Sequence, residues 1–146
     1  MASTISHLTQ ISEGLTVAIG HTAPDFQLQT DKGEYWRLSH NRGKVVVLLF
    51  YPKDETLVCT QQLCSLRDRW QQYQETGALI VGIAAGTVEE HSKFRGNHSL
   101  PISLLADIDR KVTDLYCDNG FYPSLLTRGV VIIDPDDLHI VAVIPA

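Results

Sequence analysis

Four short apolar runs along the chain have the pattern of β-strands. Residues 44–51 (KVVVLLFY) are β-branched and apolar without polar alternation, which is typical of a strand buried on both faces. Residues 78–85 and 129–133 repeat this pattern, and residues 140–144 give a fourth strand. Residues 134–137 (DPDD) join the last two strands and form a turn sequence, which predicts an antiparallel hairpin.

Segments with helical periodicity lie between these strands. Apolar residues recur at helical spacing between residues 63 and 73, and Gly77 is suited to end that helix. Thr87 and Glu90 have the spacing of a capping box and predict a second helix, and a third begins near Asp109. Strands that alternate with helices pair in parallel, while the terminal hairpin adds an antiparallel edge. We therefore expect a three-layer α/β/α sandwich with a mixed central sheet.

Residues 1–16 form a separate N-terminal extension in this pattern. Apolar residues at every third or fourth position fall within roughly a third of a helical wheel, which predicts a short amphipathic helix. These residues are Ile5, Leu8, Ile11 and Leu15. The main domain is expected to follow over residues 17–146.

Composition and charge narrow the classes of function. With 146 residues, of which 44% are hydrophobic, the chain can form one domain with a core and is not expected to be disordered. A net charge of -5 offers no concentrated basic patch, so neither nucleic acid nor a membrane surface is an expected partner. No apolar run approaches the length that spans a bilayer.

The chain contains three cysteines. Three are too few for a secreted scaffold held together by disulfides, and an odd number leaves one thiol without a partner. The N-terminus lacks the basic and apolar regions of a secretory signal, so we expect a reducing cytoplasm. In that compartment a cysteine is an inert core residue, a metal ligand or a reactive group.

Two of the cysteines lie where the first core helix is predicted to begin. Cys59 follows the first buried strand by only a few residues, and a helix N-terminus favours a thiolate over a thiol. Its spacing to Leu63 and Leu66 directs it toward the protein body, whereas Cys64 aligns with the polar side that contains Asp68. We therefore interpret Cys59 as the more reactive sulfur.

Helix geometry constrains how this pair could react. Five residues advance a helix so far that the two Cα atoms would lie about 8.6 Å apart, on sides separated by about 140°. A disulfide requires a Cα separation below about 7 Å. If Cys59 and Cys64 pair, the first turns of the helix must unwind.

The segment from Pro52 to Cys64 resembles the active site of the peroxiredoxins. Their pattern Pro-x-x-x-Thr/Ser-x-x-Cys is matched by Pro52, Thr56 and Cys59, and a second cysteine five residues on resembles the Q-type or bacterioferritin-comigratory subgroup. The similarity extends from about residue 19 to residue 145 and includes residues 23–28, 50–54 and 130–135. It implies a thioredoxin-like fold and an enzyme, a thiol-dependent peroxidase that reduces hydrogen peroxide and organic hydroperoxides.

The resemblance also implies a role for each site residue. Cys59 matches the peroxidatic cysteine, and Thr56 the hydroxyl that binds thiolate and peroxide. Arg128 matches the guanidinium that stabilises the thiolate, and Pro52 shields the pocket. Cys64 matches the resolving cysteine, whose disulfide with Cys59 is reduced by thioredoxin or glutaredoxin. The chemistry requires no metal or organic cofactor. Independently of the resemblance, we expect a cytoplasmic protein that is a monomer or a homodimer.

The sequence departs from the subgroup at several positions. Leu57 and Val58 replace the usual Pro-Gly, which gives a more apolar entrance, and Gln62 replaces an expected glutamate. The chain stops at Ala146, where the family usually has a further helix covering the sheet. We expect the segment of residues 5–15 to cover that apolar surface instead, in its own chain or a neighbouring one.

Three other interpretations remain open at this stage. One is a redox-sensing or thiol-binding module with the same fold and little peroxidase turnover. A general disulfide oxidoreductase is disfavoured because the Cys-x-x-Cys motif is absent. A metal site of Cys59, Cys64, His91 and His98 is disfavoured because the two sulfurs would point apart on the helix. Cys117 matches no known role.

Overall fold

The computed structural model describes residues 19–116 and 129–145, so the predicted helix of residues 1–16, Cys117 and Arg128 lie outside the described residues. A sheet of seven strands, in the order β2-β1-β5-β4-β3-β6-β7, forms the centre of the described part. The strands are β1 (Gln27–Thr30), β2 (Tyr35–Arg37), β3 (Val46–Phe50), β4 (Leu79–Ala84), β5 (Ser103–Ala106), β6 (Gly129–Ile133) and β7 (Ile140–Pro145). The helices are the short 3-10 helix η1 (Leu38–Asn41), α2 (Leu57–Asp68), α3 (Trp70–Gln74), α4 (Val88–His98) and α5 (Lys111–Tyr116).

The sheet is mixed, as the alternation of strands and helices predicted. Strands β3, β4 and β5 pair in parallel, and β6 pairs antiparallel with both β3 and β7. The four strands expected from the apolar runs are all present, and the terminal hairpin is confirmed. The capping box is also present, since the Thr87 side chain accepts from Glu90 N and the Glu90 side chain accepts from Thr87 N.

The sequence interpretation missed three strands and a break in one helix. Strands β1, β2 and β5 have only four, three and four residues, too few for a periodic pattern to stand out. The helix predicted to continue to Gly77 is interrupted at Arg69, whose φ of -111° and ψ of 18° are not helical. The side chains of α3 therefore do not continue the helical face of α2.

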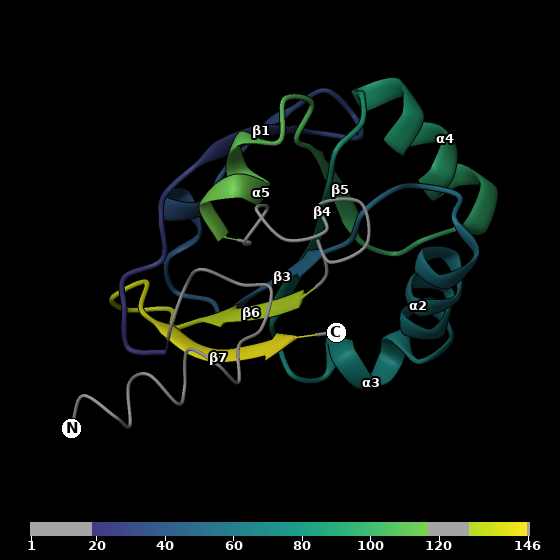
Figure 1. The fold of residues 1–146 in the computed structure, drawn as a ribbon. Helices are drawn as coiled ribbons and strands as arrows, with labels where there is room; N and C mark the ends of the chain where they lie inside the picture. Colours follow the sequence, from purple (N-terminus) through teal and green to yellow (C-terminus); the bar gives the residue numbers. More distant parts are fainter. Residues whose placement is uncertain (1–18, 117–128, 146) are drawn as a thin grey trace.

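Two cores lie on opposite faces of the sheet. On one face, Val46, Leu48 and Phe50 of β3 pack with Tyr116 of α5. On the other face, Cys59 and Leu63 of α2 pack with Phe94 of α4. Figure 1 shows α2, α3 and α4 on one side of the sheet and α5 on the other, so the predicted three-layer arrangement is confirmed.

The parallel pairing of β3 with β4 decides where the candidate site lies. Because both strands run in the same direction, the loops that follow them leave the sheet at the same edge. Tyr51 N still donates to Ile83 O at 3.1 Å, which holds the first residue after β3 against β4. Residues 52–55 therefore lie along α4, with Glu90, Lys93 and Asn97 of the helix lining the same pocket. Figure 1 shows α4 near the segment that joins β3 to α2.

Replacement of Asp107 by alanine is expected to destabilise the fold. The buried Asp107 carboxylate accepts hydrogen bonds from Val112 N (3.2 Å), Thr113 N (2.7 Å) and Thr113 Oγ1 (2.6 Å) at the start of α5. Loss of all three acceptor contacts in a buried place should lower the free energy of unfolding by about 2–4 kcal/mol, measured by urea denaturation. The control is Asp109→Ala, because among the described residues exposed Asp109 accepts from one backbone N–H, that of Lys111. An equal loss in both variants would contradict this account.

Candidate active site

Cys59 lies in the first turn of α2 and is fully buried. Thr56 is the N-cap residue, Leu57 is the first helical residue and Cys59 is the third. The Cys59 side chain shares a buried cluster with Leu63, as the helical spacing predicted. The prediction that Cys59 begins the helix and faces the protein body is therefore confirmed.

Thr56 does not cap the helix it precedes. Its hydroxyl Oγ1 donates to Lys53 O at 3.2 Å, and no side-chain hydrogen bond from Thr56 reaches the helical N–H groups. The first backbone N–H groups of a helix have no partner within the helix and carry a partial positive charge. The start of α2 therefore offers donors to an anion at the position of Cys59.

Cys64 is half-buried, one and a half turns along the same helix. The sequence placed it on the polar side with Asp68, but it packs against the edge of the cluster that contains Cys59. The two cysteines are not joined by a disulfide. Since both lie within the uninterrupted helix α2, the expected unwinding on pairing stays a prediction.

Pro52 is half-buried and lies on the wall of a pocket of about 470 Å³. The pocket lies between residues 52–55 and α4, with Glu90, Lys93 and Asn97 on the helix side. Arg128 precedes Gly129, which pairs with Phe50 at the end of β3, but Arg128 itself is outside the described residues. The structure thus places Pro52 and Thr56 in the loop before α2, and Cys59 and Cys64 on α2 itself.

A buried polar network, which the sequence interpretation missed, supports the loop before Cys59. His91 of α4 is fully buried, and its Nδ1 lies 2.5 Å from Asp54 Oδ2 while its Nε2 lies 3.1 Å from Ala84 O. The Tyr51 hydroxyl donates to Asp54 Oδ1 at 2.7 Å. Gly86 leaves room for the imidazole, because a Cβ there would come within 3.1 Å of the His91 ring. Both oxygens of Asp54 are therefore engaged inside the protein.

The electrostatics of this network follow from its burial and its charges. Burial raises the pKa of Tyr51 well above its ordinary value, and the charge of Asp54 and its hydrogen bond raise that pKa further. Burial alone would lower the pKa of His91, but the hydrogen bond and charge of Asp54 and the carbonyl of Ala84 raise it more. Tyr51 thus stays a neutral hydrogen-bond donor, and His91 is favoured as an imidazolium.

Glu55, the next residue along, is bound to the same helix. Its Oε1 lies 2.6 Å from His98 Nε2, and its Oε2 accepts from Asn97 Nδ2 at 3.0 Å. These hydrogen bonds from Asn97 and His98 lower the pKa of Glu55. Glu55 has a φ of 61°, in the left-handed region, which costs about 1 kcal/mol or more for a residue with a side chain. The contacts to α4 hold that strained backbone in place.

The two histidines therefore pair with carboxylates of the loop. His91 and His98 are seven residues apart, two turns of one helix face, and they meet the adjacent acids Asp54 and Glu55. The helical spacing of the two histidines was visible in the sequence, but nothing there indicated that they would meet Asp54 and Glu55. Within residues 19–116 and 129–145, no three His, Cys, Asp or Glu side chains come together to hold a metal ion.

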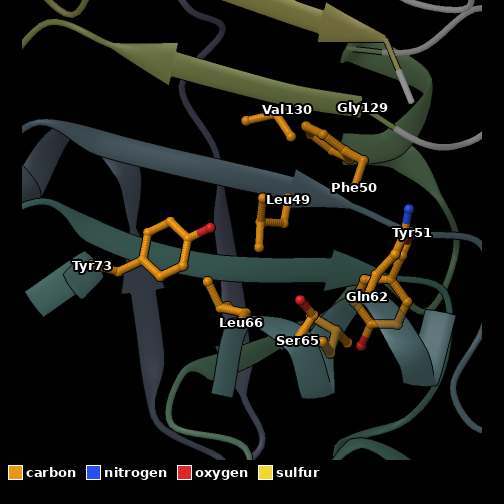
Figure 2. A pocket seen from close by; sticks show the side chains of 10 residues that line it. Leu49, Phe50, Tyr51, Gln62, Ser65, Leu66, Tyr73, Gly129 and Val130 are labelled. Atoms are coloured by element: carbon orange, nitrogen blue, oxygen red, sulfur yellow. The ribbon is translucent and has the colours of Figure 1, made fainter. Parts of the chain in front are cut away.

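A second pocket, of about 230 Å³, lies on the far side of α2. Figure 2 shows Leu49 of β3 and Val130 of β6 facing Leu66 of α2, with Tyr73 of α3 at one end. Gln62 lies on the rim, where the peroxiredoxin pattern led us to expect a glutamate. This pocket is an apolar gap between α2 and the sheet, separate from the loop before Cys59.

Comparisons with known proteins agree with this geometry. The family model described as "AhpC/TSA family" matches residues 19–142. The chain is 40% identical over 102 residues to the putative peroxiredoxin bcp of Coxiella burnetii and 41% identical over 102 residues to peroxiredoxin Bcp of Bacillus subtilis. Both alignments cover 70% of this chain, with 68% of the Coxiella protein and 65% of the Bacillus protein.

A solved structure extends the similarity to the fold. The peroxidoxin BcpB of Mycobacterium tuberculosis superposes with a TM-score of 0.75 at 30% identity, over 87% of this chain and 84% of that one. The thioredoxin-like fold implied by the sequence is thereby confirmed. No helix in the described ranges is long and apolar enough to cross a membrane. The chain belongs to the AhpC/TSA family, among its peroxiredoxins of the Bcp type, which are thiol-dependent peroxidases.

Proposed function

We propose that this chain reduces hydrogen peroxide and organic hydroperoxides, with Cys59 as the nucleophile. The observation that carries the proposal is the position of Cys59, buried in the first turn of a helix whose N-cap side chain, that of Thr56, makes no capping hydrogen bond. The positive end of the helix is suited to the oxygen that becomes negative as the peroxide bond breaks.

The first step transfers one oxygen to sulfur. The Cys59 thiolate attacks the terminal oxygen of the hydroperoxide and the O–O bond breaks. The leaving group, hydroxide from hydrogen peroxide or alkoxide from an organic hydroperoxide, takes a proton from solvent and becomes water or the alcohol. Cys59 is oxidised to sulfenic acid and the peroxide is reduced. In this proposal Thr56 contacts the thiolate and the peroxide, Arg128 stabilises the developing negative charge, and Pro52 limits access by water.

The second step regenerates the enzyme. The Cys64 thiol condenses with the sulfenic acid, an S–S bond forms and water leaves. A dithiol reductant of the thioredoxin or glutaredoxin class then reduces the disulfide by thiol–disulfide exchange. Neither step requires a metal ion or an organic cofactor. A cytoplasmic monomer or homodimer is part of the same proposal.

Mass spectrometry of the peroxide-treated wild-type protein tests this function. We expect Cys59 to be the first cysteine oxidised and Cys64 to be its disulfide partner. The same preparation should oxidise NADPH through thioredoxin reductase and thioredoxin only when a peroxide is added. First oxidation at another cysteine would contradict the proposal. Rapid oxidation of Cys59 without turnover would instead favour a redox sensor.

We also propose that residues 1–16 cover the apolar face of β3 and β6 beside α2. On that face Val47, Leu49, Val130 and Ile132 are only half-buried, and the pocket of Figure 2 opens over it. An amphipathic helix with four apolar residues on one side is suited to bury such a surface. The helix could come from the same chain or from a neighbouring copy.

Deletion of residues 1–16 is expected to lower the melting temperature by a few degrees or to change the oligomeric state, because apolar sheet surface becomes exposed. Differential scanning calorimetry and light scattering measure the two outcomes. The double variant Leu8→Ser/Ile11→Ser should reproduce the effect, whereas the control Gln10→Ser should not. Unchanged stability and assembly after the deletion would exclude this role.

A further inference from the structure

The loop before Cys59 is attached to α4 at two consecutive residues. Asp54 pairs with the buried His91, and Glu55 pairs with His98 and Asn97. Phe94 lies on the same face of α4, with its ring centre 6.2 Å from that of Tyr51 and 5.3 Å from that of His98. We call Asp54, Glu55, His91 and His98 the loop clamp.

The buried half of the loop clamp has the geometry of an ion pair. A carboxylate and a backbone carbonyl can only accept hydrogen bonds, so the contacts of His91 with Asp54 and Ala84 O are satisfied when both ring nitrogens carry a proton. The Tyr51 hydroxyl satisfies the remaining oxygen of Asp54. Since the His91 side chain has no exposed surface and that of Asp54 only 10%, removal of either partner leaves a buried charge uncompensated.

The loop clamp connects directly to the first turn of α2. Asp54 is two residues before the N-cap Thr56, and Tyr51 shares a buried cluster with Cys59. Glu55 keeps a left-handed backbone next to the N-cap, and its side chain is held by α4. The position of Cys59 is therefore fixed from two sides, by its own burial and by the clamped loop.

We propose that Asp54 and His91 are positioning residues that hold the first turn of α2 closed, and that they favour the reaction of Cys59 with peroxide over its disulfide with Cys64. This inference rests on the proposed function. Disulfide formation requires the start of α2 to unwind. A loop that is anchored at residues 54–55 restricts how far the unwound residues can move. Release of the loop clamp should therefore change the two steps in opposite directions.

The test measures both steps in the full-length protein with Asp54→Asn and His91→Gln. Rapid mixing with hydrogen peroxide, followed by acid quench, thiol alkylation and mass spectrometry, gives the rate of Cys59 oxidation. The same samples give the ratio of Cys59–Cys64 disulfide to Cys59 sulfinic acid at high peroxide. We expect Cys59 oxidation to slow by about tenfold or more, because small misplacements of a reacting group have large effects. The ratio of disulfide to sulfinic acid should rise by a similar factor.

The control is Asp31→Asn. Asp31 is also a buried carboxylate that binds α4, through Arg95 Nη1 at 3.1 and 3.2 Å, but it contacts no residue of the loop before Cys59 in any of its hydrogen bonds. The Asp31→Asn variant should destabilise the protein without changing the ratio of disulfide to sulfinic acid. A fall of both steps together in Asp54→Asn, or no change in either, would overturn the proposal.

A second variant keeps the test decisive if the buried pair is needed for folding. Glu55→Gln changes the exposed half of the loop clamp, where the Glu55 side chain is 48% exposed, so the fold should tolerate it. It should shift the two steps in the same opposite directions by about threefold, since an exposed pair contributes less than a buried one. Equal rates and an equal ratio in Glu55→Gln and wild type would refute the proposal. If wild-type Cys59 does not react with peroxide, the proposed function fails instead.

Discussion

Replacement of Cys59 by serine is expected to lower peroxide-dependent, thioredoxin-coupled NADPH oxidation to below about a thousandth of the wild-type rate. A serine hydroxyl in the same buried place is not ionised near neutral pH and cannot hold the oxygen as a sulfenic acid. The serine side chain is close in size to cysteine, so the packing against Leu63 should change little. The loss should appear in the rate of chemistry and not in the fold, which circular dichroism and thermal unfolding can verify.

Cys117→Ser is the matched control for this variant. It makes the same exchange of sulfur for oxygen at a cysteine to which the sequence assigned no role, and it should retain the wild-type turnover. Full peroxidase activity of Cys59→Ser would refute the assignment of the nucleophile. Loss of activity in both variants would point to a general effect of thiol removal and would contradict it as well.

The placement of Cys59 was predictable because it depends on local sequence. A buried strand, a short loop and the start of a helix follow one another within residues 44–64, and helical spacing alone oriented Cys59 toward Leu63. Strands β3, β4, β6 and β7 were equally predictable, because each apolar run is long enough to be recognised as a strand. The sequence close to Cys59 was therefore sufficient to predict where this cysteine lies in the fold.

The support for that position was not predictable, because it joins distant parts of the chain. Asp54 and His91 are 37 residues apart, and their contact depends on the parallel register of β3 and β4, which sends both following segments to one edge. In the sequence, His91 and His98 were considered only as members of a disfavoured metal site. Only the fold reveals that the two histidines pair with two adjacent carboxylates of the loop before Cys59.

Two local backbone conformations, at Arg69 and Glu55, explain the remaining differences between the sequence predictions and the structure. The break between α2 and α3 at Arg69 interrupts an apolar spacing that continues to Tyr73, so periodicity predicted one helix where there are two. Glu55 has a left-handed backbone conformation, which residues other than glycine seldom adopt. Its side-chain hydrogen bonds to Asn97 and His98 stabilise this conformation. Such conformations depend on tertiary partners and leave no pattern in the sequence.

Replacement of Cys64 by serine is expected to separate the two halves of the catalytic cycle. In this variant, one equivalent of peroxide should oxidise Cys59 at about the wild-type rate, because Cys64 lies only at the edge of the cluster around Cys59. Thioredoxin-coupled turnover should then fall to below about a hundredth of wild type, since no thiol remains on α2 to resolve the sulfenic acid. Mass spectrometry should find sulfenic acid after one equivalent of peroxide and sulfinic acid after an excess.

A small dithiol distinguishes loss of the resolving thiol from damage to the site. Dithiothreitol can reduce the Cys59 sulfenic acid directly, so it should restore turnover of Cys64→Ser while leaving Cys59→Ser inactive. A slow first oxidation of Cys59 in Cys64→Ser would mean that Cys64 acts through packing and not as the resolving residue. Unchanged thioredoxin-coupled turnover would mean that another thiol resolves Cys59. The helix α2 would then have no need to unwind, and the opposing effects expected from the loop clamp would lose their physical cause.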